Sequence, residues 1–148
     1  MSYSIDVNIL LYASDTANSY CTRAGEFLKK CGSNTEVCCL AWPTLMGYLR
    51  MSTHPAIFSA PLTPGDAVLN VEALLRLPQV RVLSEEEGFW DVYRQVTEGL
   101  AVRGNLVPDA HLAALLRQHD VKTLYTNDSD FRKFVFLEIR NPLALGPY

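Results

Sequence analysis

Four aspartates stand where their carboxylates can act together. Asp6 ends the first apolar segment, Asp109 opens an expected helix, and Asp128 and Asp130 follow a late apolar segment. Carboxylates that converge repel one another, and a bound cation relieves that repulsion. Oxygen ligands without a set of cysteines and histidines suit Mg²⁺ or Mn²⁺ better than Zn²⁺. The four residues therefore predict a metal-dependent enzyme that acts on phosphate.

Apolar segments alternate with helical patterns along the chain. We expect strands near residues 3–6, 36–40, 80–83, 122–126 and 135–139. We expect helices near residues 8–13, 19–30, 43–51, 63–77, 85–101 and 109–119. The alternation argues for an α/β fold in which helices cover both faces of a parallel sheet.

Such a sheet would bring the acids to one place. Ligands bind beyond the carboxyl ends of the strands in open α/β sheets. Asp6 and Asp128 follow expected strands, and the helix that starts at Asp109 points its N-terminus to the same edge. Each acid alone has a structural interpretation, as a turn residue, a helix-start acid or a turn cap. Their joint placement at one edge favours a functional site.

The composition fits one globular domain. The chain has 148 residues, of which 49% are hydrophobic and 20% charged, enough to bury a core without disulfides. No apolar stretch approaches the roughly 18 residues that span a bilayer, and no signal segment opens the chain. We therefore expect a cytoplasmic protein without a membrane partner. A net charge of −3 does not indicate nucleic-acid binding, although clustered acids lower the net charge of any metal nuclease.

Several segments resemble motifs of PIN domains, and especially of VapC toxins. They are Asp6–Ala13, Leu49–Pro55, Val107–Leu115, Thr126–Phe131 and the ending Asn141–Leu143. The resemblance extends over essentially the whole chain, in order and at the expected spacing. It implies a single PIN domain over residues 1–148, with a three-layer α/β/α fold around a central five-stranded parallel sheet. It also implies an Mg²⁺- or Mn²⁺-dependent endoribonuclease, the toxin of a VapBC-type toxin–antitoxin system. Its implied partners are RNA, a small VapB-like antitoxin and a second copy of the chain.

The matching motifs assign the acids their roles. Asp6, Asp109 and Asp128 would be the catalytic metal ligands, and Asp130 a neighbouring acid that also reaches the metal. The chain departs from the family at one position, because most PIN nucleases carry a Glu where Gly47 stands. The resemblance leaves open whether Asp130 or a water replaces that ligand, and whether activity is weakened or lost.

Other residues would support the site. Asn8 would orient the first carboxylate, and the Thr126 hydroxyl would contact water or metal. His111 follows Asp109 closely but faces another way on the helix, and we interpret it as a packing or surface residue. RNA must reach an acidic site, so basic residues should flank it. The candidates are Arg50, Arg103, Lys122, Arg132 and Lys133.

Two other functions remain open from the sequence. The missing Glu is compatible with a catalytically weak or inactive PIN domain that binds RNA or an antitoxin. A haloacid dehalogenase-type phosphatase also begins with a strand that ends in Asp, but it usually carries Asp or Thr where this chain has Asn8. The favoured hypothesis is hydrolysis of RNA phosphodiesters through an aspartate-bound metal and water.

Overall fold

The computed structural model describes residues 1–144, which contain a five-stranded sheet in the order β3-β2-β1-β4-β5. The strands are β1 (Ser2–Ile5), β2 (Val37–Ala41), β3 (Val80–Leu83), β4 (Thr123–Tyr125) and β5 (Glu138–Arg140). Every neighbouring pair is parallel. The chain builds outward from β1 to β3 and then returns to the other side of β1. The strand order therefore reverses between β1 and β4, and ligands bind at such a crevice.

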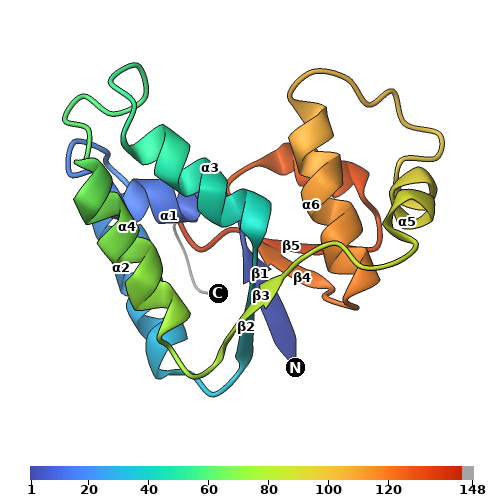
Figure 1. Cartoon of the computed structure of the whole chain (residues 1–148), viewed down its shortest axis with the longest axis horizontal. Coiled ribbons are helices and arrows are strands. Elements are labelled where there is room, and N and C mark those ends of the chain that lie inside the picture. The colour runs from blue at the N-terminus through green and yellow to red at the C-terminus, as the bar shows by residue number, and fades with distance from the viewer. Residues whose placement is uncertain (145–148) are drawn as a thin grey trace.

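Helices cover both faces of the sheet, which gives the expected three-layer α/β/α fold (Figure 1). One layer holds α1 (Val7–Ser14), α2 (Cys21–Ser33), α3 (Trp42–Ser52) and α4 (Pro64–Leu75). The opposite layer holds α5 (Phe89–Val96) and α6 (Leu106–Gln118). No helix within residues 1–144 is long and apolar enough to cross a membrane.

The alternation of side chains along β1 and β2 divides the core in two. Tyr3, Ile5 and Leu40 are buried against the layer of α1 to α4. Cys39 and Ala41 face the other way, into a core that α6 closes. Ala110 and Ala113 of α6 are fully buried in this second core, so α6 can approach the sheet closely. That packing fixes the first turn of α6 beside the ends of β1 and β4.

The helix predicted over residues 85–101 is shorter than expected. It begins only at Phe89, because Gly88 takes a left-handed conformation with φ 83° as its N-cap. Glu85 bonds instead to His111, and Gln118 donates to the carbonyls of Glu86 and Glu87. The three glutamates therefore attach a loop to α6. They do not form the first turn of a helix, although the helix predicted over residues 85–101 would have placed them there.

The last strand also lies later than the predicted 135–139. A 3₁₀ helix, η1 (Ser129–Lys133), precedes it, and the buried rings of Phe131 and Phe134 anchor this segment in the second core. Val135 is 94% exposed and takes no part in the sheet. The apolar residues from 134 to 137 thus serve as anchors and a turn, and pairing with β4 starts at Glu138.

Candidate active site

Asp6 lies at the junction between β1 and α1. It is the N-cap of α1, and its Oδ1 accepts a hydrogen bond of 2.8 Å from the amide of Val7. Its own amide donates to the carbonyl of Tyr125 at 2.9 Å, which ties the end of β1 to the end of β4. The side chain is only 8% exposed. Asp6 is therefore a buried carboxylate held from two strands and one helix.

Thr126 connects the acids to one another. Its hydroxyl, fully buried, donates to Asp6 Oδ2 at 2.7 Å. The Oγ1 atom of Thr126 in turn accepts hydrogen bonds from the amide of Asp128 at 3.0 Å and from Asn8 Nδ2 at 3.4 Å. Asn8 thus acts on the first carboxylate through Thr126 and not directly. The single hydroxyl proton of Thr126 is committed to Asp6, so this side chain positions the carboxylate.

Asp128 and Asp130 are arranged by η1. Asp128 is the N-cap of this helix, and its Oδ1 accepts from the amide of Asp130 at 2.9 Å. Asp128 is half-buried, whereas Asp130 is exposed. The turn places both carboxylates on the side of the sheet where β1 and β4 end. The predicted role of Asp128 as a turn cap and its predicted role in the site are therefore compatible.

Asp109 completes the cluster from the first turn of α6. Asp109, Asp128 and Asp130 each offer a carboxylate oxygen, and these oxygens lie within 4.8 Å of one another. Asp6 lies beside this trio, close enough for its charge to affect Asp109. The structure therefore brings all four predicted acids to one edge of the sheet, and it gives Asp130 a more central place than the sequence indicated.

The proximity of these acids changes their protonation. Burial, together with the charges of Asp128, Asp6 and Asp130, raises the pKa of Asp109 to about 7. Burial also raises the pKa of Asp6 to about 6, against the lowering effect of the bonds from Thr126 and Val7. In the absence of a cation, Asp109 is therefore partly protonated at neutral pH, and Asp6 becomes so at mildly acidic pH.

The donor set fits a hard divalent cation. All four groups are carboxylates, the ligands that Mg²⁺ and Mn²⁺ prefer. The Oδ1 atom of Asn8 is also buried without a hydrogen-bond partner among residues 1–144. An unpaired buried oxygen next to raised carboxyl pKa values is the arrangement that a cation or its bound water would satisfy.

The basic candidates divide by position. Lys133 lies 3.9 Å from Asp130 and lowers the pKa of Asp109. Arg103 is exposed just before α6, at the end where Asp109 lies. Lys122 does not fit the prediction, because it precedes β4 at the opposite edge and pairs with Asp120. The remaining two, Arg50 and Arg132, are exposed in the last turns of α3 and η1.

Position 47 of α3 can accept a side chain close to Val7. A Cβ atom built there would meet Met51 Cε at 3.4 Å and Val7 Cγ2 at 3.8 Å, which is ordinary contact. Val7 directly follows Asp6, so a side chain at position 47 would start next to the acid cluster. The backbone does not require glycine here, because no positive φ angle is recorded for Gly47.

One contact near the site was not predicted. His111 Nε2 lies 2.5 Å from Glu85 Oε1, and the ring packs edge-on against Phe89. This pair attaches the loop after β3 to α6 two residues after Asp109. The two residues are 26 positions apart, and nothing in the local sequence signals the contact. His111 is thus a surface residue, as interpreted, but it has a specific partner.

Comparisons with known proteins agree with this geometry. A family model described as the PIN domain matches residues 4–137. Ribonuclease VapC48 of Mycobacterium tuberculosis is 42% identical over 97% of this chain and 99% of its own length. VapC ribonuclease Mb2897 of Mycobacterium bovis is 32% identical over 94% of each chain.

Solved structures share the fold. VapBC2 from Rickettsia felis, bound to a DNA fragment from its promoter, superimposes with a TM-score of 0.67 at 17% identity. That match covers 95% of this chain and 98% of the neighbour. VapC20 of Mycobacterium tuberculosis, a Sarcin-Ricin loop cleaving toxin, gives a TM-score of 0.66 at 18% identity over 93% and 98% of the two chains.

The raised pKa of Asp109 predicts a pH-dependent stability in EDTA. The folded protein holds a proton that the unfolded chain releases, since the pKa rises from 3.8 to about 7 on folding. The contribution of Asp109 to the free energy of unfolding is therefore fully present below about pH 3.8 and is lost as the pH rises through about 7. At pH 8 we expect Asp109→Asn to melt about 4 °C higher than wild type, or ~1 kcal/mol after allowance for solvent screening.

The matched control is Asp120→Asn, at the other end of α6 and exposed. Thermal denaturation followed by circular dichroism at pH 4, 6 and 8 measures both variants. An Asp109→Asn variant that is no more stable than wild type at pH 8 would contradict the raised pKa of Asp109 in the folded protein.

Proposed function

Because the chain belongs to the PIN-domain family and to its VapC ribonucleases, we propose that it is a metal-dependent endoribonuclease, the toxin of a toxin–antitoxin pair. The observation that carries this proposal is the cluster of four carboxylates at the point where the strand order reverses. The family supplies the reaction class, and the cluster supplies a place for it in this chain.

We propose that Asp6, Asp109 and Asp128 hold an Mg²⁺ or Mn²⁺ ion, with Asp130 as a further ligand. When bound, such a cation supplies an acidic water and positive charge against the phosphodiester. Burial of Asp6 and the bond from Thr126 keep one carboxylate in a fixed orientation. Exposed Asp130 lies at the open side, where it can adjust to substrate or to a second cation.

RNA would approach over the exposed basic residues near the acids. Lys133 is tied to Asp130, and Arg132 precedes it on η1. Neither Arg132 nor Arg103 forms an ion pair within residues 1–144, so both are available for phosphate. Arg50 remains a weaker candidate, since its helix begins at the sheet edge and Arg50 lies in its last turn.

The proposed protein partner is a small VapB-like antitoxin. The Rickettsia felis neighbour is a VapBC2 assembly, and this chain spans nearly its whole fold. We also propose the cytoplasm as the place where this chain acts, because RNA is its proposed substrate. A homodimer, as the family resemblance implies, stays a prediction.

Of the two alternative functions that the sequence left open, one is now excluded and one still has to be tested. A haloacid dehalogenase-type phosphatase is contradicted by the PIN-domain match. A PIN domain that binds RNA or antitoxin without cutting is still an outcome of the cleavage test, because Gly47 removes one acid that most PIN nucleases have.

Metal-dependent cleavage tests the proposed function directly. We expect purified wild-type protein, free of antitoxin, to cleave structured RNA with Mn²⁺ and to stop in EDTA. Asp6→Asn should lower the rate by at least about 100-fold, because loss of a ligand should exceed the 10–100-fold cost of disturbing a ligand's neighbours. Denaturing gels with end-labelled RNA measure the rate.

The control is again Asp120→Asn, which makes the same change at the far end of α6. Its rate should stay within about twofold of wild type, as for a surface change away from the site. Full cleavage by Asp6→Asn in EDTA would exclude the aspartate site. RNA binding without cleavage by wild type in Mn²⁺ would favour the binding-only alternative.

Position 47 offers a gain of function. Because a Cβ atom fits there beside Val7, Gly47→Glu should add a carboxylate near Asp6. We expect Mn²⁺ to bind about tenfold more tightly, or ~1.4 kcal/mol, in a titration calorimeter. Gly47→Gln is the matched control, because it gains the same helix propensity without the charge. Equal Mn²⁺ affinities in the Glu and Gln variants would show that position 47 does not reach the metal.

A further inference from the structure

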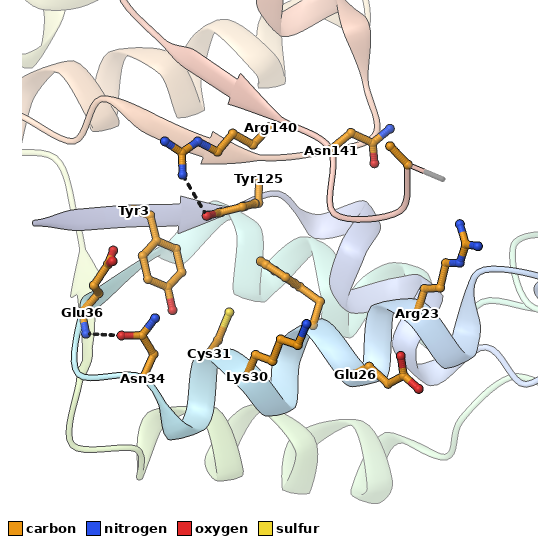
Figure 2. Close-up of a pocket in the computed structure, with 12 residues that line it drawn as sticks. Tyr3, Arg23, Glu26, Lys30, Cys31, Asn34, Glu36, Tyr125, Arg140 and Asn141 are labelled. Atoms are coloured by element: carbon orange, nitrogen blue, oxygen red, sulfur yellow. Dashed lines mark hydrogen bonds between the residues drawn. The ribbon is translucent and has the colours of Figure 1, made fainter. Parts of the chain in front are cut away.

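A second hollow lies on the face of the sheet that α2 borders. Figure 2 shows it between α2 and side chains of β1, β4 and β5, among them Tyr3, Tyr125 and Arg140. Its volume is about 910 Å³, within the usual range for ligand pockets. It exists because the layer of α1 to α4 packs over β1 to β3, while the outer face of β4 and β5 carries polar side chains and no helix. None of the four acids of the active site lines it.

The floor of this pocket is aromatic. The rings of Phe27 and Tyr125 lie 4.7 Å apart at 48°, and Tyr3 packs edge-on against Tyr125 at 5.5 Å. Phe27 and Tyr125 are only half-buried, so part of each ring faces the pocket. Exposed aromatic surface in a concave site favours a planar ring as its ligand.

Cations stand on both walls. Figure 2 shows Arg23 and Lys30 on α2 facing Arg140 on β5 across the pocket. No carboxylate within residues 1–144 pairs with Lys30. Arg23 donates from Nη1 to the carbonyl of Leu143 at 2.8 Å, which leaves its other donors free. Arg140 already forms an ion pair with Glu138. Lys30 and Arg23 are therefore the cations best able to bind an anion.

Two further polar groups converge on the pocket. The side-chain oxygen of Asn34 accepts from the amide of Glu36 at 3.0 Å, so its NH₂ donors remain for a ligand. The hydroxyl of Tyr3 is buried without a hydrogen-bond partner, although the thiols of Cys31 and Cys38 lie beside it. Tyr3 is only 4% exposed, and an unpaired buried hydroxyl is costly. Donors thus outnumber the two lining acids, Glu26 and Glu36.

We propose that this pocket binds a small aromatic anion of mononucleotide size, with a planar ring against Phe27 and Tyr125 and an anionic group at Lys30 and Arg23. The same chemistry has two sources, a free mononucleotide and one end of an RNA strand, and we assign the free mononucleotide. The pocket is concave and of single-ligand size, whereas a strand needs an open groove. This site is independent of the proposed ribonuclease activity.

Adenosine 5′-monophosphate is the probe, with adenosine and inorganic phosphate as separate arms. All are titrated into the full chain in EDTA, so that binding through a metal at the acids is absent. We expect the mononucleotide to bind at least about tenfold more tightly than either part alone, as for a ligand held at two subsites. Amide shifts in ¹H–¹⁵N spectra should concentrate at residues 23–34, 125 and 140–141.

Two neighbouring lysines give a matched pair of variants. Lys30→Glu reverses a charge inside the pocket, and Lys29→Glu makes the same change on another face of α2. Both lysines are exposed, so both variants should fold. Lys30→Glu should weaken binding of the mononucleotide about fivefold, which corresponds to the ~1 kcal/mol that an exposed charge pair can contribute. Lys29→Glu should change its affinity less than about twofold.

Several outcomes would overturn the site. These are no binding at millimolar mononucleotide, phosphate binding as tightly as the mononucleotide, shifts concentrated at the acid cluster, and equal effects of the two lysine variants. A short non-cleavable oligoribonucleotide that binds the pocket more than about tenfold tighter would assign it to an RNA strand instead. No arm depends on cleavage, so failure here and failure of the ribonuclease proposal are distinguishable.

Discussion

Repulsion among carboxyl groups is the constraint around which this molecule is built. Asp6, Asp109 and the pair Asp128 and Asp130 come from three separate elements and meet at one edge of the sheet. The fold holds them there through Thr126, which binds Asp6 by its hydroxyl and receives the amide of Asp128. Without a cation, burial raises the pKa of Asp6 to about 6 and that of Asp109 to about 7, and the charges of neighbouring carboxylates add to both rises.

Topology explains why these acids can meet at all. The strand order reverses between β1 and β4, and the amide of Asp6 donates to the carbonyl of Tyr125 across that junction. The close packing of α6 on the sheet then brings Asp109 to the same place. The second pocket has a topological origin as well, since it lies between α2 and the side chains of β4 and β5, where Tyr125 is half-buried. One sheet thus presents an acidic edge and, on its open face, a basic and aromatic hollow.

Local patterns predicted the parts of this structure that local forces decide. The order of strands and helices follows from alternating apolar segments, and the four acids follow from their places at element ends. Contacts between distant residues were harder to predict. Glu85 lies at the start of the helix expected over residues 85–101 but binds His111, and Asn8 reaches Asp6 only through Thr126. The central place of Asp130 depends on the geometry of η1, which the residues Ser129 to Lys133 do not reveal by periodicity.

The account rests on the claim that a divalent cation replaces protons shared by these carboxyl groups. Calorimetric titration of Mn²⁺ at pH 6.5, repeated in buffers of different ionisation enthalpy, measures the protons released on binding. With pKa values of about 7 for Asp109 and about 6 for Asp6, the account predicts release of about one proton per cation. Mn²⁺ binding that releases no proton, or no Mn²⁺ binding, would contradict it.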